Sequence, residues 1–119
     1  VYDMVNFHKY TIGKYHYDEY GNPEIEEEFK LISKYSPLHK IKKEVNYPTT
    51  IIFTADNDDR VPPFHSYKFA ASLQNREAQK NEIYVITKKD LGHYGGNTYQ
   101  KHIEEQAQFY DYLIRYLMK

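Results

Sequence analysis

Several things that the sequence lacks limit what this chain can do. It has 119 residues and no cysteine, which excludes a disulfide framework and a zinc site built on thiolates. Its 16 Lys and Arg offset 17 Asp and Glu, so the net charge is −1. Nucleic acids and membrane surfaces attract proteins through an excess of basic charge, so we expect neither as a partner. The apolar runs are also far shorter than the roughly 20 residues of a membrane-spanning helix.

Aromatic residues, in contrast, are abundant. The 14 Tyr and 6 Phe make up 17% of the chain, although Trp is absent. A tyrosine ring buries apolar area and keeps a hydroxyl for hydrogen bonding, so we expect a folded core although only 40% of the residues are hydrophobic. The length corresponds to one domain or less. Because the chain starts at Val1 without an initiator Met, we expect the true start of the protein to lie elsewhere.

The spacing of apolar residues predicts a helix over about 22–36. Ile25, Phe29 and Ile32 fall on one face of this helix. Asn22 is a favourable residue for the cap at its start. Three more helices are expected, at Met4–Tyr10 ahead of a loop, at Pro62–Gln74, and from Asn97 or Thr98 almost to Lys119. The last has an apolar stripe that predicts its core-facing side, made of Ile103, Ala107, Tyr110, Ile114 and Leu117.

Two segments, about 48–55 and 83–87, are predicted to be buried strands. Both are rich in β-branched residues, nearly free of charge and not alternating, which is typical of strands in a parallel sheet. The helix between them predicts a parallel crossover and therefore an α/β fold. Two strands alone cannot cover their own faces and edges. Either upstream strands are missing from this chain, or another copy supplies them.

Two residues with catalytic potential follow these strands. Asp58 comes just after the first strand and His93 a few residues after the second. Because parallel strands end at the same edge of a sheet, we expect the two side chains to emerge together. In that position an acid can hold an imidazole in one tautomer and stabilise it when it becomes protonated. The glycines around His93 allow a sharp turn and keep bulk away from the ring.

Ordinary structural explanations exist for the same residues. An acidic turn after a strand is often a solvated loop, and a histidine beside glycines is often part of a surface turn. The run 56–59 does not fit a calcium loop, because Arg60 and Val61 stand where the pattern needs a further ligand and a glycine. We expect neither a metal site nor a cofactor. The remaining histidines follow no metal-ligand spacing: His8, His16, His39, His65 and His102.

Several segments resemble signatures of one enzyme family, the prolyl oligopeptidases. These are serine peptidases with an α/β-hydrolase domain and a propeller lid. The resemblance covers nearly the whole chain, with the motifs in the family's order. They are Phe7-His8-Lys9-Tyr10-Thr11-Ile12-Gly13, Lys34-Tyr35-Ser36-Pro37-Leu38-His39, Asp56-Asn57-Asp58-Asp59-Arg60-Val61-Pro62-Pro63-Phe64-His65-Ser66, Lys68-Phe69-Ala70-Ala71-Ser72-Leu73-Gln74 and Gly92-His93.

The resemblance implies that residues 1–119 are the C-terminal portion of an α/β-hydrolase domain, with an incomplete sheet. The part that carries the nucleophile and the propeller would then be absent. Family triads follow the order Ser, Asp, His, and Asp58 and His93 match the last two. Other residues match substrate-binding positions of the family. Arg60 matches an arginine that hydrogen-bonds a substrate carbonyl, and Tyr20 and Val61 match residues that form walls of the proline pocket.

The sequence also departs from the family pattern. It has no Gly-x-Ser-x-Gly elbow, so we expect the nucleophile and the oxyanion donors to lie upstream. His16 stands where the family usually has a tryptophan that stacks on proline, which weakens the expected preference for proline. In the segment Gly92-His93-Tyr94-Gly95-Gly96, Tyr94 replaces a glycine and is expected to narrow the site.

The function predicted from these observations is that of a serine-type oligopeptidase. It would cleave short peptides on the carboxyl side of proline, although this chain alone is expected to be inactive. The alternatives are oligopeptidase B-like specificity for basic residues, dipeptidyl-peptidase-like specificity, or a non-catalytic interaction module with exposed tyrosines as anchors. We expect the chain to self-associate through its uncovered faces. We expect a cytoplasmic location, with a periplasmic or secreted one left open.

Overall fold

The computed structural model describes residues 1–96 and 98–117. Its centre is a two-stranded parallel sheet, in which β1 (Thr50–Ala55) pairs with β2 (Ile83–Lys88). Helix α3 (Phe64–Gln74) connects them, so the predicted parallel crossover is confirmed. The first strand starts two residues later than expected. Proline has no N–H to give to a ladder, and Pro48 instead accepts a hydrogen bond from the Thr50 hydroxyl.

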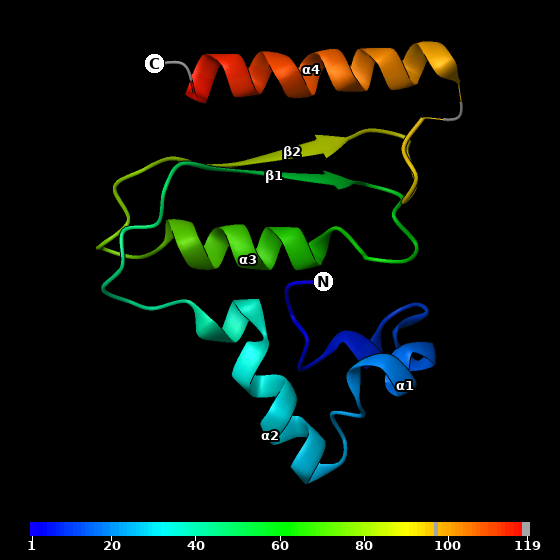
Figure 1. Ribbon diagram of the computed structural model, residues 1–119, viewed down its shortest axis with the longest axis vertical. Helices are drawn as coiled ribbons and strands as arrows, with labels where there is room; N and C mark the ends of the chain where they lie inside the picture. Colours follow the sequence, from blue (N-terminus) through cyan, green and yellow to red (C-terminus); the bar gives the residue numbers. More distant parts are fainter. Residues whose placement is uncertain (97, 118–119) are drawn as a thin grey trace.

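The sheet lies between two helices (Figure 1). One face packs on α3 through a buried apolar cluster. The other face carries α4 (Tyr99–Leu117), which contacts the strands through aromatic rings. Phe53 lies 5.6 Å from Phe109, and Tyr84 lies 4.8 Å from Tyr116, measured between ring centroids. The α3 cluster consists of Ile52, Ala70, Leu73 and Ile83.

The predicted core-facing stripe of α4 is wrong for this chain. Ile103, Tyr110 and Ile114 are all about half exposed, and Ala107 is exposed as well. The residues that touch the sheet lie on a neighbouring side of the helix, where aromatic rings reach those of the strands. The side chain of Leu117, the expected start at Asn97 and the end at Lys119 lie outside the described residues.

The N-terminal segment forms short turns instead of the single early helix that we expected. The chain folds back so tightly at Gly13 that a Cβ there would lie 2.0 Å from the Phe7 carbonyl oxygen, and only glycine fits. This tertiary packing overrides local helix preference. The elements observed are the 3-10 helices η1 (Phe7–Lys9) and η2 (Gly13–His16), then α1 (Tyr17–Tyr20), α2 (Glu26–Tyr35) and the 3-10 helix η3 (Pro37–Lys40).

Helix α2 starts later than predicted. The Asn22 side chain accepts a hydrogen bond from the Glu24 N–H at 2.9 Å, so Asn22 forms a local turn ahead of the helix and does not cap it. Of the predicted apolar face only Ile32 is fully buried, at 1% exposed. Phe29 and Ile25 are 41% and 46% exposed, because little of the described chain covers that side.

A buried carboxylate ties the N-terminal segment to α3. Asp3 is 1% exposed and accepts hydrogen bonds from the Lys68 ammonium at 2.8 Å and from the Asn6 side chain at 3.1 Å. Burial alone would raise the pKa of Asp3. The bonds to Lys68 and Asn6 outweigh that effect and lower the pKa below its ordinary value, so the carboxylate is charged at neutral pH.

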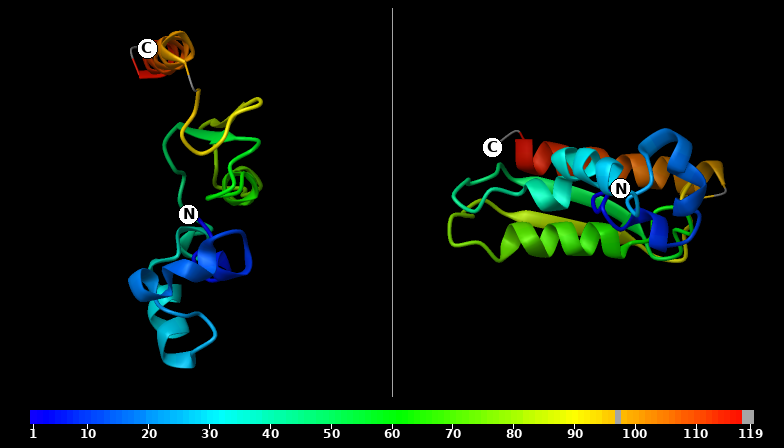
Figure 2. Two further views of the ribbon diagram at one scale, coloured as in Figure 1. Left: turned by 90° about the vertical axis from the view of Figure 1, so that its right-hand side faces the viewer. Right: turned by 90° about the horizontal axis from the view of Figure 1, so that it is seen from below.

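The chain is flatter and more extended than a complete domain. Its dimensions are 44 × 38 × 18 Å and its radius of gyration is 16.2 Å (Figure 2). A compact domain of this length would have a radius of gyration of about 13.5 Å. The described chain is thus a partial α/β fold, with α4 and the N-terminal segment at opposite ends of the layers. Within the described residues, no helix is long and apolar enough to cross a bilayer.

Replacing Lys68 with Met should lower the free energy of unfolding by about 1–3 kcal/mol, because the Asp3 carboxylate loses its cation. The pKa of Asp3 is lowered in the fold, so this contribution exists above the unfolded pKa and disappears as the pH falls through the folded one. Urea denaturation at neutral and acid pH measures the effect. The control is Lys30→Met, which removes an exposed pair with Glu26. Equal losses in both variants would contradict the prediction.

Candidate functional site

The turns that follow β1 and β2 lie side by side at one edge of the sheet. The N–H of Asp56 donates to the Lys88 carbonyl at 3.0 Å, and the N–H of Asn57 donates to the Leu91 carbonyl at 3.1 Å. These bonds extend the parallel pairing past the strand ends. They bring together the two loops that carry Asp58 and His93, as the strand order predicted.

Asp58 and His93 are in hydrogen-bond contact. The His93 Nδ1 lies 3.0 Å from Oδ1 and 2.9 Å from Oδ2 of the carboxylate. The same Oδ1 accepts the N–H groups of Arg60 at 3.0 Å and Val61 at 2.8 Å. The Asp58 side chain is 11% exposed, whereas that of His93 is 36% exposed. The acid is therefore shielded and held by its own turn, while the imidazole reaches solvent.

These contacts determine which nitrogen of the imidazole carries its proton. Burial would raise the pKa of Asp58, but the Val61 N–H, the His93 ring and the Arg60 N–H hold it below the ordinary value. Asp58 is therefore ionised at neutral pH and can only accept hydrogen bonds. The His93 Nδ1 must then be the donor, and in the neutral form of the ring Nε2 has a lone pair that can take a proton. This arrangement suits a general base.

A pocket of about 200 Å³ lies beside His93. All four predicted substrate-binding residues line it: Arg60, Val61, His16 and Tyr20. The rings of His16 and Tyr20 are 5.8 Å apart and only 34° from parallel, so they form adjoining parts of its wall. The structure thus brings together residues from two segments that are far apart in the sequence.

The pocket also contains residues to which sequence reasoning gave no role. Thr11 lines it and donates its hydroxyl to the Arg60 carbonyl at 3.2 Å, which ties the two segments together. Its φ of 45° is unusual for a β-branched residue, and such conformations cluster at functional sites. The signal that could have found these residues is the family-like motif over 7–13. The other lining residues from that motif are Phe7, Tyr10, Ile12 and Gly13.

Tyr94 contacts both His93 and Arg60. Its ring is 5.3 Å from the His93 ring, edge to face, and the Arg60 guanidinium lies 5.0 Å from its centroid. A cation over an aromatic face is attracted by the ring's negative face. Tyr94 is 80% exposed and does not line the 200 Å³ pocket, so it does not narrow that pocket.

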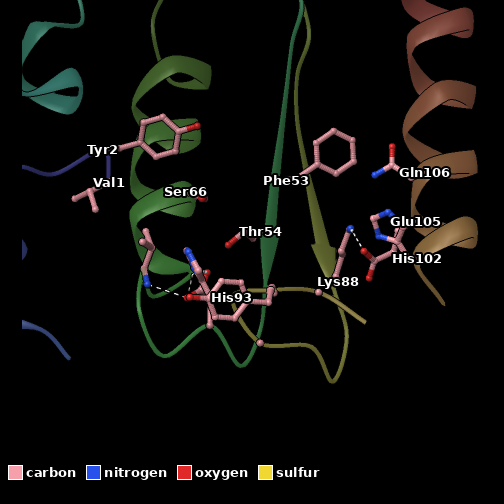
Figure 3. A pocket seen from close by; sticks show the side chains of 16 residues that line it. Val1, Tyr2, Phe53, Thr54, Ser66, Lys88, His93, His102, Glu105 and Gln106 are labelled. Carbon is pink, nitrogen blue, oxygen red and sulfur yellow. Dashed lines mark hydrogen bonds and ion pairs between the residues drawn. The ribbon is translucent and has the colours of Figure 1, made fainter. Parts of the chain in front are cut away.

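His93 also lines a second hollow, of about 550 Å³ (Figure 3). It runs between the end of the sheet, α3 and α4, and Thr54, Ser66 and Glu105 are among its lining residues. Among the hydrogen bonds of the described residues, none joins a serine hydroxyl to His93. The site as described has an acid and a base but not a nucleophile in contact with them.

Carboxylates of the acidic run 56–59 accept backbone hydrogen bonds in the turns that follow the strands. Asp58 is engaged as described, and the Asp56 carboxylate accepts the Leu91 N–H at 3.4 Å. Over residues 1–96 and 98–117, no three or more His, Asp and Glu side chains gather in a way that could hold a metal ion. The geometry is that of an ionised carboxylate that holds an imidazole through a hydrogen bond, beside a pocket.

We compared the chain with known protein families, sequences and structures. The family model described as "Prolyl oligopeptidase family" matches residues 1–119. The chain is 43% identical to prolyl oligopeptidase dbiP of Dendrothele bispora over 113 residues, 93% of this chain and 15% of that protein. It is 38% identical to the dual function macrocyclase-peptidase POPB of Amanita bisporigera, over 97% of this chain and 16% of that protein.

Solved structures agree with this result. A prolyl endopeptidase structure matches with a TM-score of 0.90 and 36% identity, over 97% of this chain and 17% of that one. Prolyl oligopeptidase B from Galerina marginata, bound to a 35mer hydrolysis and macrocyclization substrate, matches with a TM-score of 0.86. That match has 36% identity over 98% of this chain and 17% of the other. The chain therefore spans about a sixth of its relatives' length, has part of their α/β-hydrolase fold, and belongs to the prolyl oligopeptidase family.

Proposed function

We propose that the protein containing this chain is a serine peptidase that cleaves short peptides on the carboxyl side of proline. In this proposal Asp58 and His93 are two members of a Ser-Asp-His triad, and the serine belongs to another part of the protein. The observation that carries the proposal is the hydrogen bond from His93 to an ionised Asp58, beside a pocket lined by Arg60. Relatives named as prolyl endopeptidases support the reaction type.

The proposed reaction uses the free Nε2 of His93. As the serine hydroxyl attacks the peptide carbonyl, Nε2 takes its proton, and the Asp58 carboxylate stabilises the resulting imidazolium. The imidazolium then gives that proton to the leaving amine. Water, deprotonated by His93 in turn, then attacks the acyl carbonyl. The bond from that carbon to the serine oxygen breaks, and the imidazolium returns its proton to the serine. The hollow of about 550 Å³ that His93 lines has room for a further segment of the protein to bring the serine to Nε2.

The proposed specificity depends on the 200 Å³ pocket. A proline ring would lie against Val61, Tyr20 and the His16 ring. Arg60 would hydrogen-bond the substrate carbonyl one residue before the proline, and its charge strengthens such a bond. Imidazole covers less of a proline ring than indole does, so we propose a weaker proline preference than a tryptophan at position 16 would give.

Asp58→Asn and His93→Ala in the full-length protein should each lower kcat for a chromogenic proline peptide by a factor on the order of 10⁴ or more. The first change places an amide N–H where the His93 Nδ1 needs an acceptor and so favours the wrong tautomer, and the second removes the base. The matched control is Asp59→Asn, an exposed carboxylate in the same turn, which should leave kcat unchanged. Turnover that survives His93→Ala would refute the assignment.

His16→Trp should lower KM for proline peptides several-fold with little change in kcat, because the larger ring covers more of the bound proline. Steady-state kinetics on peptides with proline or alanine before the cleaved bond will measure the change in preference. Tyr15→Trp, at a neighbouring residue that is 74% exposed, is the control and should alter neither constant. An equal effect on both peptides would show that His16 does not contact the proline.

The isolated chain should be inactive and should self-associate. Activity requires a nucleophile from elsewhere in the protein, and the apolar side of α4 has half-exposed Ile103, Tyr110 and Ile114. Multi-angle light scattering over a concentration series should show a mass above the 14.3 kDa of one chain. A monomer at all concentrations would argue against self-association, and turnover blocked by a serine-directed phosphonate would place the nucleophile within these residues.

A further inference from the structure

The loop that carries His93 is attached to the protein at both ends. At its start, the Leu91 carbonyl accepts the Asn57 N–H, which joins it to the Asp58 turn. Within the loop, the Gly95 N–H donates to the Gly92 carbonyl at 3.1 Å and closes a tight turn around His93. At its other end, the Gly96 N–H donates to the carboxylate of Glu105 on α4.

Glu105 contacts both the loop and the strand β2, and Figure 3 shows the contact with Lys88 of β2. One oxygen, Oε1, accepts the Gly96 N–H at 3.0 Å, and the other, Oε2, pairs with the Lys88 ammonium at 3.0 Å. Lys88 is the last residue of β2, so the carboxylate joins strand, loop and helix. The Glu105 side chain is 14% exposed and that of Lys88 is 25% exposed, so water competes little with the pair.

The loop is shaped to admit this carboxylate. Gly95 has a φ of +78°, and a Cβ there would lie 2.8 Å from Oε2 of Glu105. Burial would raise the pKa of Glu105, but Lys88 and the Gly96 N–H lower it, so Glu105 is charged at neutral pH. Its neighbour Glu104 provides a contrast, because it is exposed and accepts a hydrogen bond from Gln100 one turn earlier in the same helix.

We propose that Glu105 is a positioning residue for His93, which holds the far end of the catalytic loop through the Gly96 N–H and is itself fixed by Lys88. Without it, the loop keeps its anchor at the Asp58 turn but loses the one on α4. His93 then spends less time with its Nε2 directed at the nucleophile. A displacement of about 1 Å at such a group can cost on the order of 10²-fold in rate.

This inference rests on the proposed function and predicts a specific kinetic pattern in the full-length enzyme. Glu105→Ala should lower kcat by about 10²-fold and leave KM for a proline peptide unchanged, because the pocket of Arg60 and His16 does not involve Glu105. Glu105→Gln should recover most of kcat, since its amide oxygen still accepts the Gly96 N–H. Glu104→Ala is the matched control and should match the wild type.

Hydrogen exchange followed by mass spectrometry tests the same inference without activity. Peptides covering 92–96 should exchange faster in Glu105→Ala, and those covering α3 should not. If Glu105→Ala does not fold, Lys88→Met, which leaves the carboxylate without its cation, should show the same pattern more weakly. Unchanged exchange in the loop, a rise in KM equal to the fall in kcat, or no rescue by glutamine would overturn the inference. A wild type that does not cleave proline peptides would refute the proposed function, and the exchange result would still decide the role of Glu105.

Discussion

The parallel pairing of β1 with β2 is the constraint on which the candidate site depends. Ala55 pairs with Lys88, so both strands end at the same edge, and the turns beyond them continue the ladder through backbone hydrogen bonds. A shift of one residue would turn every strand side chain to the opposite face and separate Asp58 from His93. The buried apolar cluster between the sheet and α3 opposes such a shift, because it would expose that cluster to water. A stable core beneath the sheet thus sets the geometry of an exposed histidine at its edge.

The same hydrogen bonds that close the turn after β1 also set its electrostatics. The N–H groups of Arg60 and Val61 complete the turn by donating to Asp58, and by doing so they keep its carboxylate ionised despite partial burial. An ionised Asp58 then determines which nitrogen of His93 carries the proton. Because the Arg60 N–H is bound to Asp58, the turn also places the backbone from which the Arg60 side chain reaches the pocket. The Asp58 carboxylate therefore closes the turn, selects the tautomer of His93 and helps to place Arg60. A substitution at Asp58 would disturb all three.

Local sequence signals predicted the sheet well and the N-terminal segment poorly. The two strands are rich in β-branched residues and nearly free of charge whatever surrounds them, so their positions and parallel order followed from the sequence. The turns before α2 depend on close approaches such as that of Gly13 to Phe7, which join residues without any periodic pattern. The meeting of Asp58 and His93 followed from strand order, but the pocket assignments came from motif resemblance alone. Glu105 was missed because two adjacent glutamates on a polar helix do not indicate which one faces a loop. The domain assignment of residues 1–119 and the cytoplasmic location stay predictions.

The failed prediction for α4 has a physical explanation of its own. An apolar stripe at helical spacing reflects the whole environment of a helix, whereas the described contacts of α4 are with the two strands and with the loop that carries His93. This chain spans about a sixth of its relatives' length, and its radius of gyration exceeds that of a compact domain. Half-exposed Ile103, Tyr110 and Ile114 are then the side that further parts of such a protein would cover. The stripe and the aromatic contacts of α4 are compatible, because they lie on different sides of the helix.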